Sequence, residues 1–249
     1  MGKSYSNEFA GIDEKLVGAN ENIRNLEIEI SRFFQEGKYP ILPEHDKEEL
    51  LKAIEYHKNR VIPLRFSVLT GEAVHHLRSC LDHIAWTFST IQYREENFRK
   101  IEFPVFEKRP VDKNSLARYE GKVKGIANPD VLNLIERLQP YNAADPINTV
   151  LFVIHNFDAI DKHRELVLSV PTGAREFGPD VQDFVAGYQR AHPEFTPVDL
   201  AIKLKPYGKL VPQISFKNFG RREIQPVIEG LMELFNETVM IVKGFAQYL

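Results

Sequence analysis

The longest regular pattern in the chain is PLRFSVLTGEAVHHLRSCLDHIAWTFSTIQY, residues 63–93, in which apolar residues recur every three or four positions. That period is typical of an α-helix with one buried face. A proline is tolerated in the first turn of such a helix. The sequence therefore predicts a central helix from Pro63 to about Tyr93, with one apolar stripe: Leu69, Ala73, Leu77, Cys80, Ile84, Phe88 and Ile91.

Long amphipathic segments flank this helix at both ends of the chain. The spacing near the N-terminus alternates between three and four, which keeps an apolar seam facing a partner helix. This seam is Phe9, Ile12, Leu16, Ala19, Ile23, Leu26, Ile30 and Phe33. The C-terminal stripe is Ile224, Ile228, Leu231, Phe235, Val239, Val242 and Phe245. We expect the N-terminal helix to pack within a bundle, with a second copy of the chain as the alternative partner.

Shorter elements lie between the long helices. Asn128 and Pro129 open a helix predicted over Pro129–Leu138, and Asp145 with Pro146 opens another that carries TVLFVIHNFDAIDKH. The stretch IEFPVFEKRP between them and the central helix is loop-rich. Alternating residues predict strands at Glu165–Val170, Val198–Lys205 and Leu210–Phe216. The expected fold is mainly α (α+β): a single domain over residues 1–249, a helical bundle with a small antiparallel β element around 165–217.

Composition is that of an ordinary globular protein, with 43% hydrophobic and 27% charged residues. A net charge of −3 gives no overall attraction to nucleic acid, so contact with RNA would need a local basic patch. The best candidate is Lys108–Gly125, which also contains Tyr119. A solvated loop is the simpler explanation of that stretch.

The one cysteine, Cys80, lies on the apolar stripe and is expected to be a core residue rather than a nucleophile. A chain without a disulfide partner or an apolar run of about 20 residues is expected to be cytoplasmic, with no membrane partner. No glycine-rich phosphate loop or dinucleotide-binding motif is present, so no cofactor is expected.

The polar residues of the central helix form two rows. Glu72, His76, Ser79, His83 and Trp86 share one stripe, and Arg78 and Asp82 form a neighbouring row at ion-pair spacing. His75 lies between these rows. Short-chained, histidine-rich positions predict a strip that is buried or faces a cleft.

A second polar cluster ends the helix that follows Pro146. Its residues are His155, Asn156, Asp158, Asp161, Lys162, His163 and Arg164. Cations in a last turn also complement the helix dipole, so a well-terminated surface helix explains part of this pattern.

The segment Arg78-Ser-Cys-Leu-Asp-His83 resembles the Arg-x4-His motif of the HEPN superfamily, which includes all-helical, metal-independent endoribonucleases. Ser79 departs from the Asn, Asp or His more usual after the arginine. The resemblance implies that His83 is the general acid/base and Arg78 the phosphate clamp, oriented by Ser79, Asp82 and Glu72. Substrate would be bound by the remaining polar residues: His75, His76, Asn156, Asp161, Lys162, His163 and Arg164. Arg78 and His83 point about 140° apart on a helix, which favours a composite site in a homodimer.

Two blocks carry a second resemblance: GExxHxLRSxLDHxxW at Gly71–Trp86 and NxxxxDKHR at Asn156–Arg164. Together with an FPVF-like loop and an LQPY segment, they resemble a widespread, poorly characterised group of bacterial proteins over Pro63–Leu168. This resemblance implies that the two polar clusters meet in space. The HEPN resemblance further implies RNA as substrate, a toxin or phage-defence setting, and a cognate antitoxin or regulatory partner.

Two alternatives use the same residues. Glu72 with His75 or His76 could bind a metal ion whose shell is completed by Asp158, Asp161 or His163. No second Glu-x-x-His exists, so the main prediction contains no metal. In the other alternative, Arg78, Asp82 and the histidines form a polar network that fixes helix packing. Recognition would then belong to the Phe9–Phe33 seam or to the β element.

Overall fold

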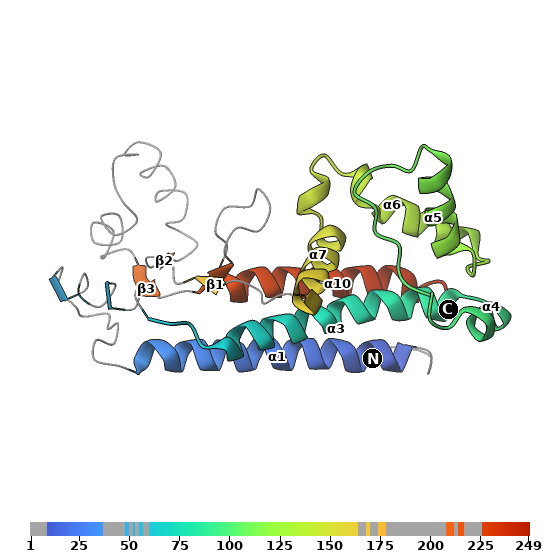
Figure 1. Cartoon of the computed structure of the whole chain (residues 1–249). Coiled ribbons are helices and arrows are strands. Elements are labelled where there is room, and N and C mark those ends of the chain that lie inside the picture. Colours follow the sequence, from blue (N-terminus) through green and yellow to red (C-terminus); the bar gives the residue numbers. More distant parts are fainter. Residues whose placement is uncertain are drawn as a thin grey trace.

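The computed structural model of the chain is mainly helical (Figure 1). It describes residues 9–36, 60–163 and 226–249, together with the short pieces 48–49, 52, 55–56, 168–169, 174–177, 208–211 and 214–216. Three long helices form the body: α1 (Ala10–Gln35), α3 (Leu64–Phe88) and α10 (Val227–Ala246). Shorter helices are α4 (Ile91–Asn97), α5 (Lys113–Val123), α6 (Pro129–Leu138) and α7 (Val150–His163), with 3-10 turns η2 (Pro140–Asn142) and η3 (Pro146–Asn148).

Helix α3 is the centre of the bundle, and α1, α7 and α10 all pack against it. Helices α1 and α3 are antiparallel, because Gly11 of α1 lies against His83 while Gly18 lies against His76. The predicted N-terminal seam is confirmed and packs within the chain. Its buried members within α1 are Ile12, Ala19, Ile23, Leu26, Ile30 and Phe33.

The aromatic rings at one end of the bundle join the two ends of the sequence. Phe88 of α3 packs edge-on against Phe9, with ring centroids 6.4 Å apart, and against Phe245 of α10 at 6.0 Å. Phe103, from the loop after α4, contacts Phe245 at 5.9 Å. Helices from both ends of the chain therefore share one hydrophobic core.

The central helix is shorter than the sequence predicts, since α3 ends at Phe88 and α4 begins at Ile91. Ser89 is extended and its hydroxyl donates to the carbonyl of Ala85 at 2.8 Å. The Thr90 side chain accepts from the backbone N–H of Tyr93 and so caps α4. Arg94 donates from Nε to the Ser89 carbonyl at 2.8 Å, which satisfies a backbone group at the break.

Two other helices also differ from expectation. Helix α5 was not predicted; its signal is the capping box in which Asp112 accepts from the backbone N–H of Ser115 and the Ser115 hydroxyl lies at the backbone N–H of Asp112. The predicted helix at Pro146 is divided into η3 and α7 at Thr149, whose hydroxyl donates to the Pro146 carbonyl.

The buried face of α10 is rotated relative to the predicted stripe. Leu234, Thr238 and Ile241 are buried, whereas Phe235 and Val239 are only partly buried. Thr238 fits this apolar face because its hydroxyl donates to the carbonyl of Leu234 at 2.7 Å. Helix α6 matches its predicted bounds, with the Asn128 side chain capping its N-terminus.

Two short strand pairs are present among the described residues. β1 (Leu168–Ser169) pairs antiparallel with β4 (Ser215–Phe216), and β2 (Ala174–Phe177) pairs antiparallel with β3 (Gly208–Val211). The predicted strand at Val198–Lys205 lies outside the described residues, as does most of 164–225. The small β element as a unit therefore stays a prediction.

Candidate functional site

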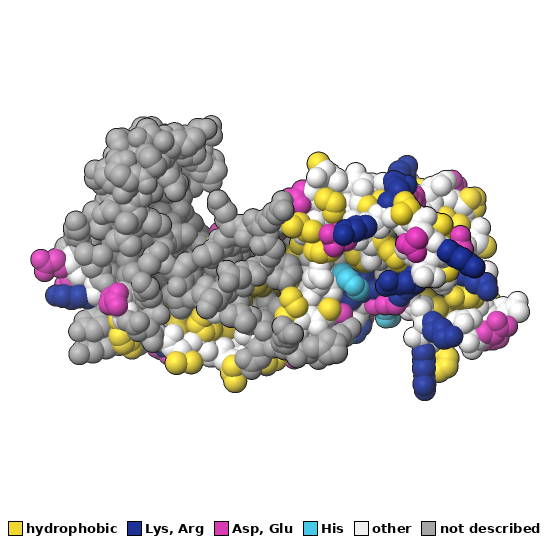
Figure 2. All heavy atoms as spheres, turned by 45° about the horizontal axis from the view of Figure 1, so that its top comes forward, with side chains coloured by type: hydrophobic (Ala, Val, Ile, Leu, Met, Phe, Trp, Pro, Cys, Tyr) yellow, Lys and Arg dark blue, Asp and Glu magenta, His cyan; other side chains and the backbone are white. Residues whose placement is uncertain are grey.

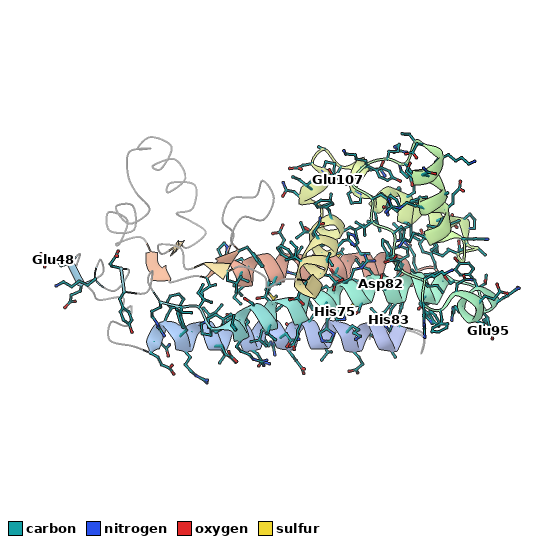
Figure 3. All side chains as sticks on the ribbon, in the orientation of Figure 1. Glu48, His75, Asp82, His83, Glu95 and Glu107 are labelled. Atoms are coloured by element: carbon teal, nitrogen blue, oxygen red, sulfur yellow. The ribbon has the colours of Figure 1, made fainter. Side chains whose placement is uncertain are left out.

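The predicted catalytic residues divide between two faces of α3. Figure 3 shows Asp82 on the side of α3 toward the loop after α4 and His83 on the side toward α1. The hydrogen bonds of Arg78 and Asp82 to that loop and the contact of His83 with Gly11 agree with this placement. Within one chain, Arg78 and His83 therefore do not converge on a common point.

Arg78 and Asp82 hold the backbone of the loop at Phe103. The Arg78 guanidinium is 4% exposed, and its Nη2 donates to the Phe103 carbonyl at 2.9 Å and to Asp82 Oδ1 at 2.8 Å. The same Asp82 oxygen accepts from the Phe103 N–H at 2.9 Å. The Arg78–Asp82 ion pair thus provides hydrogen-bond partners for both the N–H and the carbonyl of Phe103, a residue that lies in no helix or strand.

Gln139, at the C-terminal end of α6, fixes the other side of this loop. Its buried amide donates to the Pro104 carbonyl at 3.0 Å and to the Ile135 carbonyl at 3.1 Å, and its oxygen accepts from the Phe106 N–H at 3.1 Å. The FPVF loop is therefore held between α3 and the LQPY segment. We name this arrangement of Arg78, Asp82 and Gln139 around residues 103–106 the loop staple.

The position of Arg78 bears on the phosphate-clamp role that the HEPN resemblance implies for it. A phosphate clamp must reach substrate, whereas Arg78 is buried beneath the 103–106 loop. Its Nη2 donates to that loop, and among the described residues its Nη1 has no hydrogen-bond partner. The bonds of Arg78 Nη2 and Asp82 to Phe103 are of the kind that the alternative prediction, a polar network that fixes packing, requires.

Two charged residues outside the predicted catalytic set complete the outer side of the staple. Glu102 Oε2 lies 3.8 Å from Arg78 Nη2, and its other oxygen pairs with Lys122 Nζ. Burial, together with the neighbouring Arg78, lowers the pKa of Lys122. Arg78, Glu102 and Lys122 thus form a row of charges that alternate in sign, which stabilises the packing of α5 against the loop that follows α4.

His76 and His83 pack over the two glycines of α1. A Cβ built on Gly18 would lie 2.9 Å from His76 Nε2, and one built on Gly11 would lie 3.2 Å from His83 Nδ1. The two glycines are seven residues apart on α1 and the two histidines are seven residues apart on α3, so the same contact repeats after two helical turns. Each imidazole occupies the space that a larger side chain on α1 would fill. The expectation of a buried strip holds in part: His76 and Ser79 are half-buried, whereas Glu72, His83 and Trp86 are exposed.

His76 gives a prediction for the pH dependence of stability. Burial, then the nearby Lys15 and His75, lowers its pKa from the ordinary 6.5, and only Glu72 opposes this. The unfolded chain therefore binds more protons than the folded chain below 6.5, and stability falls as the pH drops through that value. We expect urea unfolding of His76→Gln to show a weaker loss of stability than wild type between about pH 7.5 and pH 5. Equal losses in the two proteins would contradict this assignment.

The two polar clusters of the sequence meet where α3 and α7 cross, as the block resemblance implies. His75 Nδ1 lies 2.8 Å from Asp158 Oδ1. The His75 side chain is 51% exposed while that of Asp158 is 6% exposed, so a buried carboxylate holds a solvent-accessible imidazole. An ionised carboxylate only accepts hydrogen bonds, so Nδ1 carries the proton in neutral His75 and Nε2 has the free lone pair.

Asp161 is the second carboxylate at this crossing. A Cβ built on Gly71 would lie only 2.0 Å from its Oδ1, so the absence of a side chain at Gly71 makes room for Asp161. Burial, followed by the charge of Asp158, raises the pKa of Asp161; His75 opposes this shift and Glu72 adds to it. We name His75, Asp158, Asp161 and Glu72 the crossing cluster.

The other predicted residues lie around α7 or on the core side of α3. Asn156 is half-buried on α7. Lys162 and His163 end α7 with side chains outside the described part of the structure, and Arg164 lies wholly outside it. Cys80 is a core residue as predicted: burial raises the pKa of its thiol to about 12.

No family model, no curated protein and no solved structure matches the chain. In the described ranges, no group of three or more His, Cys, Asp or Glu residues could hold a metal ion. None of the helices among those residues is long and apolar enough to cross a membrane.

Proposed function

We propose that the chain is a HEPN-like, metal-independent endoribonuclease whose general acid/base is His75, held by Asp158. The supporting observation is the 2.8 Å contact between an exposed imidazole and a buried carboxylate. This arrangement fixes the ring and its tautomer and leaves Nε2 directed away from Asp158. His83, favoured by the sequence spacing, packs against Gly11 instead.

The proposed reaction is cleavage by the ribose 2′-hydroxyl. His75 Nε2 takes the hydroxyl proton, the 2′-oxygen forms a bond to phosphorus, and the bond from phosphorus to the 5′-oxygen breaks. Asp161 is the proposed proton donor to the leaving 5′-oxygen, because it is the second carboxyl group at the crossing and burial raises its pKa. The products are a cyclic phosphate and a free 5′-hydroxyl, so neither a metal nor a cofactor takes part.

The proposal needs cations to offset the carboxylates of the crossing cluster. Lys162, His163 and Arg164 directly follow Asp161 in the sequence, and we assign them to the scissile phosphate. Asn156, on α7, is assigned to substrate binding near the same crossing, whereas His76 faces Gly18 of α1 and is left out of the site. In the proposal, Lys162, His163 and Arg164 take the place of Arg78 and supply the positive charge that the reaction requires.

The test is cleavage of total RNA in EDTA by wild type, His75→Ala and Asp158→Asn, with folding checked by circular dichroism. We expect His75→Ala to lose about 10²- to 10⁴-fold in rate, because the proton acceptor is removed. Asp158→Asn keeps the shape of the site but removes the charge that holds Nδ1–H, so we expect a smaller loss, of about tenfold or more. Unchanged cleavage by folded His75→Ala would contradict the proposal.

A non-catalytic interaction protein is the second candidate, and the loop staple favours it. Arg78, Asp82, His76 and His83 all have packing contacts, which a scaffold would need without any chemistry. Wild type that is folded and cleaves neither total RNA nor tRNA would favour this candidate over the nuclease.

The biological setting is part of the proposal and rests on the HEPN resemblance. It comprises a cytoplasmic toxin or phage-defence role, a homodimer, and a cognate antitoxin or regulatory partner. The small β element around residues 165–217 belongs to the same proposal as a surface for such a partner.

A further inference from the structure

The end of the bundle at the α3–α4 junction carries exposed aromatic rings next to cations. Trp86 is 39% exposed and Phe98 is 60% exposed. Arg94 Cζ is 5.7 Å from the Trp86 ring centroid, and Arg94 precedes Phe98 by four residues. Arg99 extends the row, with its Cζ 5.2 Å from the Phe98 ring.

Further cations surround these rings. Residues 98–125 contain eight Lys or Arg and four Asp or Glu, a net charge of +4 in a chain whose total is −3. Two of those four carboxylates have partners within the fold, since Glu102 pairs with Lys122 and Asp112 caps α5. Figure 2 shows Lys and Arg side chains gathered over this described end of the molecule.

The α4 and α5 parts of this surface are held together. The Thr90 N–H donates to the Gly125 carbonyl at 2.8 Å, and the Tyr93 hydroxyl donates to the Gly121 carbonyl at 3.2 Å. Exposed Lys124 at the end of α5 therefore lies near α4, which carries Phe98 at its C-terminus. Glu95 and Glu96 are the carboxylates on α4, and Gln92 donates to Glu96.

We propose that this surface binds single-stranded RNA by stacking bases on Trp86 and Phe98 and pairing phosphates with Arg99, Lys100 and Lys124. Rings with an exposed face beside a basic track are how proteins bind single strands with little sequence preference. Trp86 lies eleven residues after His75 on α3, about 16 Å along the axis. The inference deepens the proposed function, on which it rests for RNA as substrate: the surface would hold the strand that the crossing cluster cleaves.

Trp86 is the one tryptophan of the chain, so its fluorescence reports directly on this surface. The experiment titrates the full chain with 2′-O-methyl oligouridylate, which lacks the hydroxyl needed for cleavage. We expect saturable quenching of Trp86 that weakens as salt is raised, because phosphate contacts release counterions. Phe98→Ala should weaken binding by about tenfold or more, since one stacked base is lost.

Leu64→Ala is the matched control. Leu64 is 64% exposed, similar to Phe98, but begins α3 and lies about 33 Å from Trp86 along the axis. We expect binding by Leu64→Ala to equal that of wild type. No change in fluorescence at saturating oligonucleotide, or equal weakening by both variants, would overturn the inference.

Two further results separate this inference from its alternatives. Tighter binding to vesicles that contain phosphatidylserine than to the oligonucleotide would assign the surface to a membrane and overturn the inference. Because the probe is not cleaved, quenching that depends on Phe98 supports the surface even where the cleavage assay finds no nuclease. Cleavage that depends on His75, without oligonucleotide binding at Trp86, would overturn the surface and leave the proposed function standing.

Discussion

Replacing Arg78 with alanine is expected to lower the free energy of unfolding by about 3 kcal/mol. The change removes the guanidinium that donates to the Phe103 carbonyl and breaks the ion pair of the buried Arg78 with Asp82. We place the loss at the lower end of the range for broken buried pairs, because the Asp82 side chain is 34% exposed and water can reach it. Urea unfolding followed by circular dichroism measures the loss.

Arg65→Ala provides the control on the same helix. Arg65 is 54% exposed and has one long ion pair, with its Nε 3.7 Å from Glu29 Oε1. An exposed pair of this kind contributes little, so we expect a change within about 0.5 kcal/mol. Equal losses in Arg65→Ala and Arg78→Ala would contradict the loop staple. Cleavage per folded molecule should be nearly unchanged in Arg78→Ala, whereas a phosphate clamp would lose activity without losing stability.

Gly71→Ala should cost about 2 kcal/mol of stability and separate His75 from Asp158. The added Cβ would lie 2.0 Å from Asp161 Oδ1 and 2.3 Å from its Cγ, so rotation of the carboxylate oxygens alone cannot relieve the overlap. Overpacking of this kind costs about 1–3 kcal/mol, and the better helix propensity of alanine returns less than that. Asp161 must leave this position, either by a change of its χ1 rotamer or by a shift of α7 away from α3. A shift of α7 also lengthens the contact between Asp158 and His75.

Gly121→Ala is the matched glycine control. A Cβ at Gly121 meets nothing within 4 Å, and the residue is exposed within α5. The substitution should raise stability by about 0.5–1 kcal/mol through helix propensity alone. If Gly71→Ala were as stable as wild type and kept the same cleavage rate, then the close approach of α3 and α7 would not position the site.

Periodicity made the long helices predictable. The α1 seam repeats over many turns, and each of its residues reinforces the same choice of face. The break after Phe88 was missed because Ser89 and Thr90 do not interrupt the apolar spacing. The break is stabilised by the Thr90 cap and by the backbone carbonyls that accept from Arg94. Both interactions form only once the backbone has changed direction between α3 and α4, so the apolar spacing does not show them.

The candidate site was harder to predict, since its partners are distant in sequence. His75 and Asp158 are 83 residues apart, and neither helix alone shows which of its histidines faces the other. The Arg78–His83 spacing drew attention to residues that helix geometry turns to different faces. Gly71 was the one sign in the sequence of a close approach to α3 at this point. A glycine inside a helix lowers stability, so its presence there indicates that a neighbouring group needs the space.

The most direct measurement is the rate of RNA cleavage in EDTA by His75→Ala compared with His83→Ala, each checked for folding. Both variants remove one imidazole from α3, but of the two only His75 has a buried carboxylate partner in the part of the chain that the structure describes. We expect His75→Ala to fall by about 10²-fold or more and His83→Ala to stay within a few-fold of wild type. Loss of cleavage in folded His83→Ala, with His75→Ala unaffected, would contradict the assignment and return the site to the Arg-x4-His spacing.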